Sequence, residues 1–90
     1  MTKKIAVVVR DRQEEALRMS LGMVLMDDTI DVYVLDRTLG TSEEILMNIE
    51  TMQDMEMNLY TNVVENRGLQ YLPLSEIAER LLHYDIVVPY

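Results

Sequence analysis

Short apolar runs recur along the chain, and their residue types are those of β-strands. Ile5–Val9 has no polar interruption, which is the pattern of a parallel strand covered on both faces. Ile30–Leu35 predicts a second strand, Met57–Thr61 a short third one, and Asp85–Val88 a last one. Leu69–Leu72 is a candidate for a further strand between the last two. The pattern therefore predicts four or five strands.

The segments between these runs carry apolar residues every three or four positions, which indicates helices. Glu14–Met26 predicts the first helix, and its apolar side chains spread beyond one face. A second helix is predicted after Thr41, which can act as N-cap while Glu44 bonds back to the backbone amide of the cap. The buried face of this second helix is predicted to consist of Ile45, Ile49 and Met52.

A third helix is predicted after Pro73. Ser75 can cap its N-terminus, and Glu76 and Glu79 are favourable near the positive end of a helix. Its apolar residues are Ile77, Ala78, Leu81 and Leu82. Strand and helix thus alternate up to the last strand.

This alternation predicts parallel βαβ units with right-handed crossovers. The segment 62–68 is too short for a crossover helix, so either it forms one helical turn or Leu69–Leu72 is barely a strand. The chain shows no internal repeat, linker or low-complexity segment. We therefore predict a single α/β domain over residues 1–90, with three layers: a parallel sheet of four or five strands and helices on both faces.

Size and composition add an expectation about assembly. A chain of 90 residues buries a small share of its surface, yet 49% of these residues are hydrophobic. Met19, Met23 and Met26 follow helical spacing, and they serve either the core or a subunit interface. A homo-oligomer is expected, with the first helix contributing to its interface.

The charge balance narrows the classes of partner. Sixteen acidic and eight basic side chains give a formal net charge of −8, which repels phosphate backbones and anionic membranes. We therefore expect no nucleic-acid and no membrane partner. The apolar run Ile5–Val9 is too short for the core of a signal peptide or for a membrane span, so a cytoplasmic location is expected.

The residue inventory excludes the common nucleophilic mechanisms. The chain has no cysteine, and the predicted helices or their caps account for Ser20, Ser42 and Ser75. The one histidine, His83, lies near a helix end, where it is predicted to interact with terminal carbonyls; a catalytic role is the alternative. No catalytic residue is predicted, and the protein is not expected to be an enzyme.

Metal and cofactor sites lack sequence support as well. The densest acidic group, Asp27, Asp28 and Asp31, fits a solvated turn between helix and strand better than a metal site. The glycines are isolated, so the chain contains neither a dinucleotide fingerprint nor a P-loop. No metal and no cofactor is predicted.

One candidate ligand site remains, at the carboxyl ends of the strands, where open parallel sheets bind their ligands. Its predicted members are Arg10, Asp11, Arg12, Asp36, Arg37, Thr61 and Asn62. Such paired charges can hold a small polar ligand or a loop of a partner. The alternative is a set of solvated ion pairs with no ligand.

The order of the elements resembles the DsrE/DsrF-like family of small sulfur-relay proteins. The resemblance is carried by KKIAVVVRD, EEALRMSLGMVL, DVYVLDR, LYTNVVENRGL and LPLSEIAERLLHYDIVV, which together cover nearly the whole chain. It implies a DsrE-like, flavodoxin-like domain that assembles into oligomers. It also implies a persulfide-bearing cysteine soon after the third strand, where this chain has Thr61 or Asn62.

The resemblance therefore implies the fold and the assembly of the family without its sulfur chemistry. The leading hypothesis is a non-catalytic DsrE-like domain that self-associates as a structural or binding component beside a sulfur-relay partner. The alternative is a small-ligand or regulatory binding module that uses the strand-end loops. A third, weaker hypothesis is an enzyme whose chemistry needs only arginine and carboxylate groups.

Overall fold

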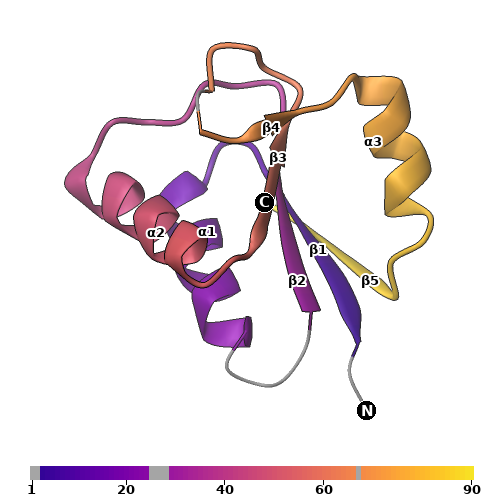
Figure 1. Ribbon diagram of the computed structural model, residues 1–90, viewed down its shortest axis with the longest axis horizontal. Helices are drawn as coiled ribbons and strands as arrows, with labels where there is room; N and C mark the ends of the chain where they lie inside the picture. The colour runs from indigo at the N-terminus through magenta and orange to yellow at the C-terminus, as the bar shows by residue number, and fades with distance from the viewer. Residues whose placement is uncertain (1–2, 25–28, 67) are drawn as a thin grey trace.

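The computed structural model describes residues 3–24, 29–66 and 68–90, which form five strands and three helices. The strands make one parallel sheet in the order β4-β3-β2-β1-β5 (Figure 1). Their bounds are β1 Lys4–Val9, β2 Thr29–Val34, β3 Asn58–Thr61, β4 Gln70–Tyr71 and β5 Ile86–Pro89. The predicted parallel α/β fold is confirmed.

Helices cover both faces of this sheet, as predicted. Figure 1 shows α1 (Gln13–Val24) and α2 (Glu43–Asp54) on one face and α3 (Leu74–Leu81) on the other. The steps from β1 to β2 to β3 run in one direction, so right-handed crossovers place α1 and α2 on the same face. The step from β4 back to β5 crosses the sheet in the opposite direction, which places α3 on the opposite face.

The alternation of side chains along β1 divides the core between these two faces. Ile5, Val7 and Val9 pack in the cluster under α1 and α2, whereas Ala6 and Val8 pack in the cluster under α3. All five are buried, so β1 is covered on both faces as its sequence predicts. The α3 cluster is the smaller one, because a single helix of eight residues covers that face.

The last strand, β5, lies at the edge of the sheet beside β1. Its apolar residues Ile86 and Val87 remain 39% and 41% exposed. The N–H of Tyr90 donates to the carbonyl of Val8 at 2.7 Å, and neighbouring residues of a strand point their N–H groups to opposite sides. The nitrogen of Pro89 therefore faces the free edge, where it offers no donor to an added strand.

The connection between β3 and β4 is short, and both predicted alternatives, a single turn and a very short strand, hold in part. The N–H of Asn66 donates to the carbonyl of Val63 at 3.1 Å, which closes one turn. The strand β4 contains only two residues, Gln70 and Tyr71. Gly68, which lies between this turn and β4, has φ 88°, a conformation that glycine adopts without strain.

Two predicted helix caps are wrong. Ser42, not Thr41, is the N-cap of α2, and its Oγ accepts from the N–H of Ile45 at 3.2 Å. Glu44 does not turn back to the cap, because its carboxylate pairs with Arg18 of α1. Pro73 occupies the N-cap position of α3 without a side-chain bond, so Ser75 lies inside the first turn.

The wide apolar surface predicted for the first helix is largely used inside the domain. Met19, Leu21 and Met23 are partly buried and pack against the core, while Leu25, Met26, Asp27 and Asp28 lie outside the described residues. The buried face of α2 consists of Ile45, Ile49 and Met52, as predicted. The larger exposed apolar side chains of this layer are on α2, where Leu46 and Met47 are 56% and 62% exposed. No helix in the described ranges is long and apolar enough to span a membrane.

Candidate functional site

The carboxyl ends of the strands bring the predicted residues together, because parallel strands end at the same edge of the sheet. Arg10 Nε lies 3.1 Å from Asp36 Oδ2. Asn62 forms two hydrogen bonds with the same aspartate. Its Oδ1 accepts from the Asp36 N–H at 2.7 Å, and its Nδ2 donates to Asp36 Oδ1 at 3.0 Å. The hydrogen bonds from Asn62 and then from Arg10 hold the pKa of Asp36 below its ordinary value. Arg37 pairs with Asp11 in the same way across the loops.

The other two predicted residues have different surroundings. Arg12 pairs with Glu15 at 3.6 Å, and its guanidinium lies 4.9 Å from the centre of the Tyr90 ring. Thr61 is fully buried, and its Oγ1 accepts from the N–H of Val63 at 3.1 Å. A buried threonine with a bonded hydroxyl holds the chain in place and presents no group to a ligand.

Two amides that the sequence analysis did not single out tie these loops together. Asn66 is buried; it donates to Arg37 O and Thr61 Oγ1, both at 3.0 Å, and accepts from the N–H of Leu39 at 2.8 Å. Gln13 bonds three further loop atoms, and its partners are Arg10 O, Thr38 O and the N–H of Gly40. The polar groups at this edge thus bind one another. A ligand site here stays a prediction.

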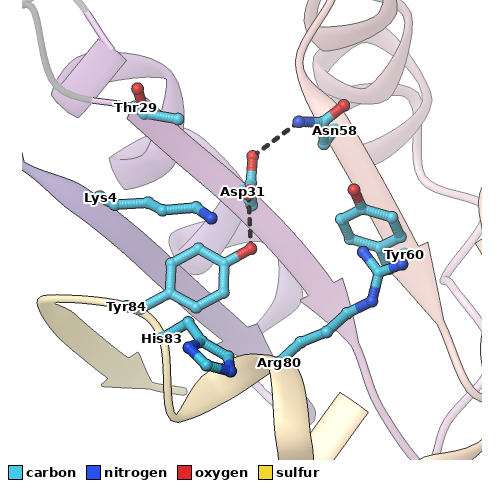
Figure 2. Close-up of a pocket in the computed structure, with 8 residues that line it drawn as sticks. All are labelled: Lys4, Thr29, Asp31, Asn58, Tyr60, Arg80, His83 and Tyr84. Atoms are coloured by element: carbon cyan, nitrogen blue, oxygen red, sulfur yellow. Dashed lines mark hydrogen bonds between the residues drawn. The ribbon is translucent and has the colours of Figure 1, made fainter. Parts of the chain in front are cut away.

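A cavity of about 300 Å³ lies at the opposite edge, where the strands begin (Figure 2). The first residues of β1, β2 and β3 contribute to its wall, and α3 with the turn after it closes the other side. The lining residues are Lys4, Thr29, Asp31, Asn58, Tyr60, Arg80, His83 and Tyr84. Smaller hollows adjoin it on both sides, one beside Met55 and Glu56 and one along α3 beside Glu76 and Glu79.

Asp31 is the most unusual member of this wall, because this acidic residue is only 4% exposed. The sequence predicts that Asp31 is part of a solvated turn. In the structure Asp31 is buried within β2, so that interpretation is wrong for this residue. It accepts a hydrogen bond from the Tyr84 hydroxyl at 2.5 Å and one from Asn58 Nδ2 at 3.0 Å. Figure 2 shows these two bonds on different sides of the carboxylate. A buried carboxylate is costly unless it is bonded in this way.

Three tyrosines extend the network of this carboxylate, and one of them, Tyr84, bonds it directly. The Tyr84 hydrogen points to Asp31, so the Tyr33 hydroxyl donates to Tyr84 across 2.8 Å. Tyr33 stacks on Tyr60 at a centroid distance of 4.9 Å and meets Tyr84 edge-on at 5.9 Å. Burial, and then the bond to Asp31, raise the pKa of Tyr84, and burial raises that of Tyr33. Both hydroxyls therefore stay protonated and act as donors at neutral pH.

Basic side chains form the outer part of the cavity. Lys4 Nζ lies 4.9 Å from the centre of the Tyr84 ring, and the Arg80 guanidinium lies 5.2 Å from that of Tyr60. The expected bond between the His83 side chain and helix-terminal carbonyls is not formed. The backbone N–H of His83 donates to Arg80 O at 3.0 Å, while its imidazole lines the cavity without a hydrogen bond to any described residue.

Comparison with known proteins supplies no relative from which a role could be taken. No family model matches the chain, and neither a characterised protein nor a solved structure matches it. The resemblance to the DsrE/DsrF-like family therefore stays a prediction from the sequence.

Proposed function

We propose that this chain is a non-catalytic domain that binds a small polar ligand in the cavity between α3 and the amino ends of β1, β2 and β3. The observation that carries the proposal is Asp31, a nearly buried carboxylate in the wall of an open cavity. Ligand pockets commonly combine aromatic walls with a few converging polar groups, and their volumes begin at about 300 Å³. The cavity has this composition, and its volume suits a small ligand.

The bonding of the polar groups favours binding over catalysis. Each oxygen of Asp31 already accepts a hydrogen bond, one from Tyr84 and one from Asn58. The hydroxyls of Tyr33 and Tyr84 keep their protons, so neither is a base or a nucleophile at neutral pH. These two hydroxyls therefore do not exchange protons with a ligand at neutral pH.

Two threonine variants test the location of the site, because an exposed threonine is found at each edge of the sheet. Thr29 lines the cavity, and Thr38 lies in the loops of the opposite edge. Thr29→Tyr fills part of the cavity and is expected to weaken binding about tenfold or more, whereas Thr38→Tyr is expected to leave it unchanged. The measurement is a titration with a panel of small polar molecules followed by amide NMR shifts.

The reverse result would place the ligand at the strand-end loops, the site that the sequence predicts, and would contradict the cavity proposal. The same titration gives an independent map, since the shifted amides are expected around Asn58 and Tyr84 and not around Asp36 and Asn62.

A second proposal, self-association beside a sulfur-relay partner, is supported by apolar side chains on the surface. Leu46 and Met47 lie next to each other on the outer side of α2 and are more than half exposed. Burying them against a second copy would remove this apolar area from water. The sulfur-relay partner, the first-helix contribution and the cytoplasmic location belong to this proposal and come from the sequence alone.

The expected result is a mass of at least twice 10.5 kDa by light scattering, retained at moderate salt because the net charge of −8 opposes association at low salt. Replacing Leu46 and Met47 by serine is expected to shift the protein toward a monomer. Val64→Ser, at a 72% exposed residue outside α2, is the control and should leave the mass unchanged. A monomer mass for the unaltered protein at every salt concentration would contradict the proposal.

A further inference from the structure

The basic residues of the cavity are less closely paired with carboxylates than three of the four other arginines that the structure describes; the exception, Arg12, lies 3.6 Å from Glu15. Arg10, Arg18 and Arg37 each have a carboxylate oxygen within 3.1 Å. Arg80 meets its partner Glu76 only at 3.8 Å. Lys4 Nζ has no carboxylate partner among the described residues, and its contact is the Tyr84 ring. Two incompletely neutralised cations therefore line one cavity of a protein whose net charge is −8.

The carboxylate of Asp31 does not neutralise Lys4 and Arg80 in the part of the cavity that a ligand would enter. Asp31 is 4% exposed, and both of its oxygens are occupied by bonds from Tyr84 and Asn58. Figure 2 shows Lys4 and Arg80 on different sides of the Tyr84 ring, with the Tyr84 hydroxyl bonded to the carboxylate. A cationic ligand would be repelled by Lys4 and Arg80, and both oxygens of Asp31 already accept a hydrogen bond. An anionic ligand meets two positive charges and further donors.

From this arrangement we infer that the cavity takes a small oxyanion, of the carboxylate or phosphate type, held between Lys4 and Arg80. This inference rests on the proposed ligand-binding function and specifies the class of ligand. Arg80 presents a planar fork of donors that matches two oxygens of a carboxylate or phosphate, and Lys4 contributes a point charge. His83 and Thr29 also line the cavity and supply further hydrogen-bonding groups.

The C-terminus of α3 carries a partial negative charge that disfavours an anion, and this charge can be compared with the charges of Lys4 and Arg80. The cavity lies near the C-terminus of α3, where the helix carries a partial negative charge of about half a unit. The whole charges of Lys4 and Arg80 exceed it. Arg80 is itself in the last turn of α3, where a basic side chain offsets that partial charge.

The test is a titration of the full chain, followed by amide NMR, with inorganic phosphate, succinate, the neutral succinamide and the cationic 1,4-diaminobutane. Phosphate or succinate is expected to shift the amides of Asn58 and Tyr84 in a saturable manner, and the two anions show which oxyanion type fits. Arg80→Gln is expected to weaken the binding about tenfold or more, since it removes a charge-assisted pair. Added sodium chloride is expected to weaken it further.

Arg37→Gln is the matched control, because it makes the same change of charge at the opposite edge of the sheet. It is expected to change the affinity less than twofold, and an equal loss in both variants would reduce the effect to general electrostatics and overturn the inference. Saturable binding of succinamide or 1,4-diaminobutane in place of the anions would overturn the oxyanion assignment while the proposed binding function stands. A cavity that responds to none of the four probes would overturn both.

Discussion

Ile77→Ala is expected to lower the free energy of unfolding by about 3 kcal/mol and to loosen α3 from the sheet. Ile77 is completely buried and is the one residue of α3 in the buried core, where it packs in the cluster with Val8 and Tyr33. Shortening it removes apolar contact and leaves a void that a helix of eight residues cannot close by itself. Urea unfolding followed by circular dichroism measures the change.

Leu82→Ala is the matched control, since Leu82 directly follows the same helix but is 82% exposed. It is expected to change the stability by less than about 0.5 kcal/mol. Equal losses in the two variants would show that Ile77 is not the anchor of α3. Because α3 forms one wall of the cavity, the loosened helix of Ile77→Ala is also expected to weaken ligand binding, whereas Leu82→Ala is not.

The elements could be predicted from the sequence because they depend on local patterns. The unbroken run Ile5–Val9 specifies β1 to within one residue, and the spacing of apolar residues specifies the buried face of α2. The caps could not be predicted with the same certainty, since Thr41 and Ser42 are adjacent and both are good caps. The pairing of Glu44 with Arg18, two residues 26 positions apart, excludes the reciprocal bond that would have favoured Thr41.

The meeting of the carboxyl-end residues could also be predicted, because it follows from the parallel direction of the strands. The hydrogen-bond partners of these residues could not be predicted. The bonds from Asn62 to Asp36 and from Asn66 to Thr61 depend on the path of the loops, and no spacing in the sequence encodes that path. The prediction of this edge therefore included the charged residues and Asn62, but it did not include Asn66 and Gln13, whose amides bond the loop atoms.

The cavity could not be predicted, because its walls come from four separate parts of the chain. Lys4, Thr29, Asn58 and Arg80 come together because β1, β2 and β3 are neighbours in the sheet and α3 packs across them. The sequence does not specify this strand order. One local signal did point to it. Asp31 interrupts an otherwise apolar strand, and Tyr33 two residues later shares its face, so a polar network on that face follows from the alternation of a strand.

The network around Asp31 is also expected to make the protein strongly sensitive to alkaline pH. An unperturbed tyrosine releases its proton near pH 10, and this is the behaviour of the unfolded chain. In the folded protein burial raises the pKa of both Tyr84 and Tyr33, and the bond to Asp31 raises that of Tyr84 further. Below about pH 10 both states keep these protons, so the contribution to stability is fully present. Above it the unfolded chain releases protons that the folded protein retains, and stability falls.

Half of the unfolded tyrosines are already deprotonated at pH 10, so each tyrosine that keeps its proton in the fold is expected to cost about 1 kcal/mol between pH 10 and 11, and the pair roughly 2 kcal/mol. Urea unfolding at pH 8, 9, 10 and 11 measures the slope. Tyr84→Phe is expected to cost about 2 kcal/mol at pH 8, because Asp31 loses a donor, and to make the decline above pH 10 about half as steep. Tyr71→Phe removes a hydroxyl from a ring that is 50% exposed and should follow the unaltered protein. An unchanged slope in Tyr84→Phe would mean that Tyr84 releases its proton in the folded protein at the same pH as in the unfolded chain, which would contradict a raised pKa of its hydroxyl.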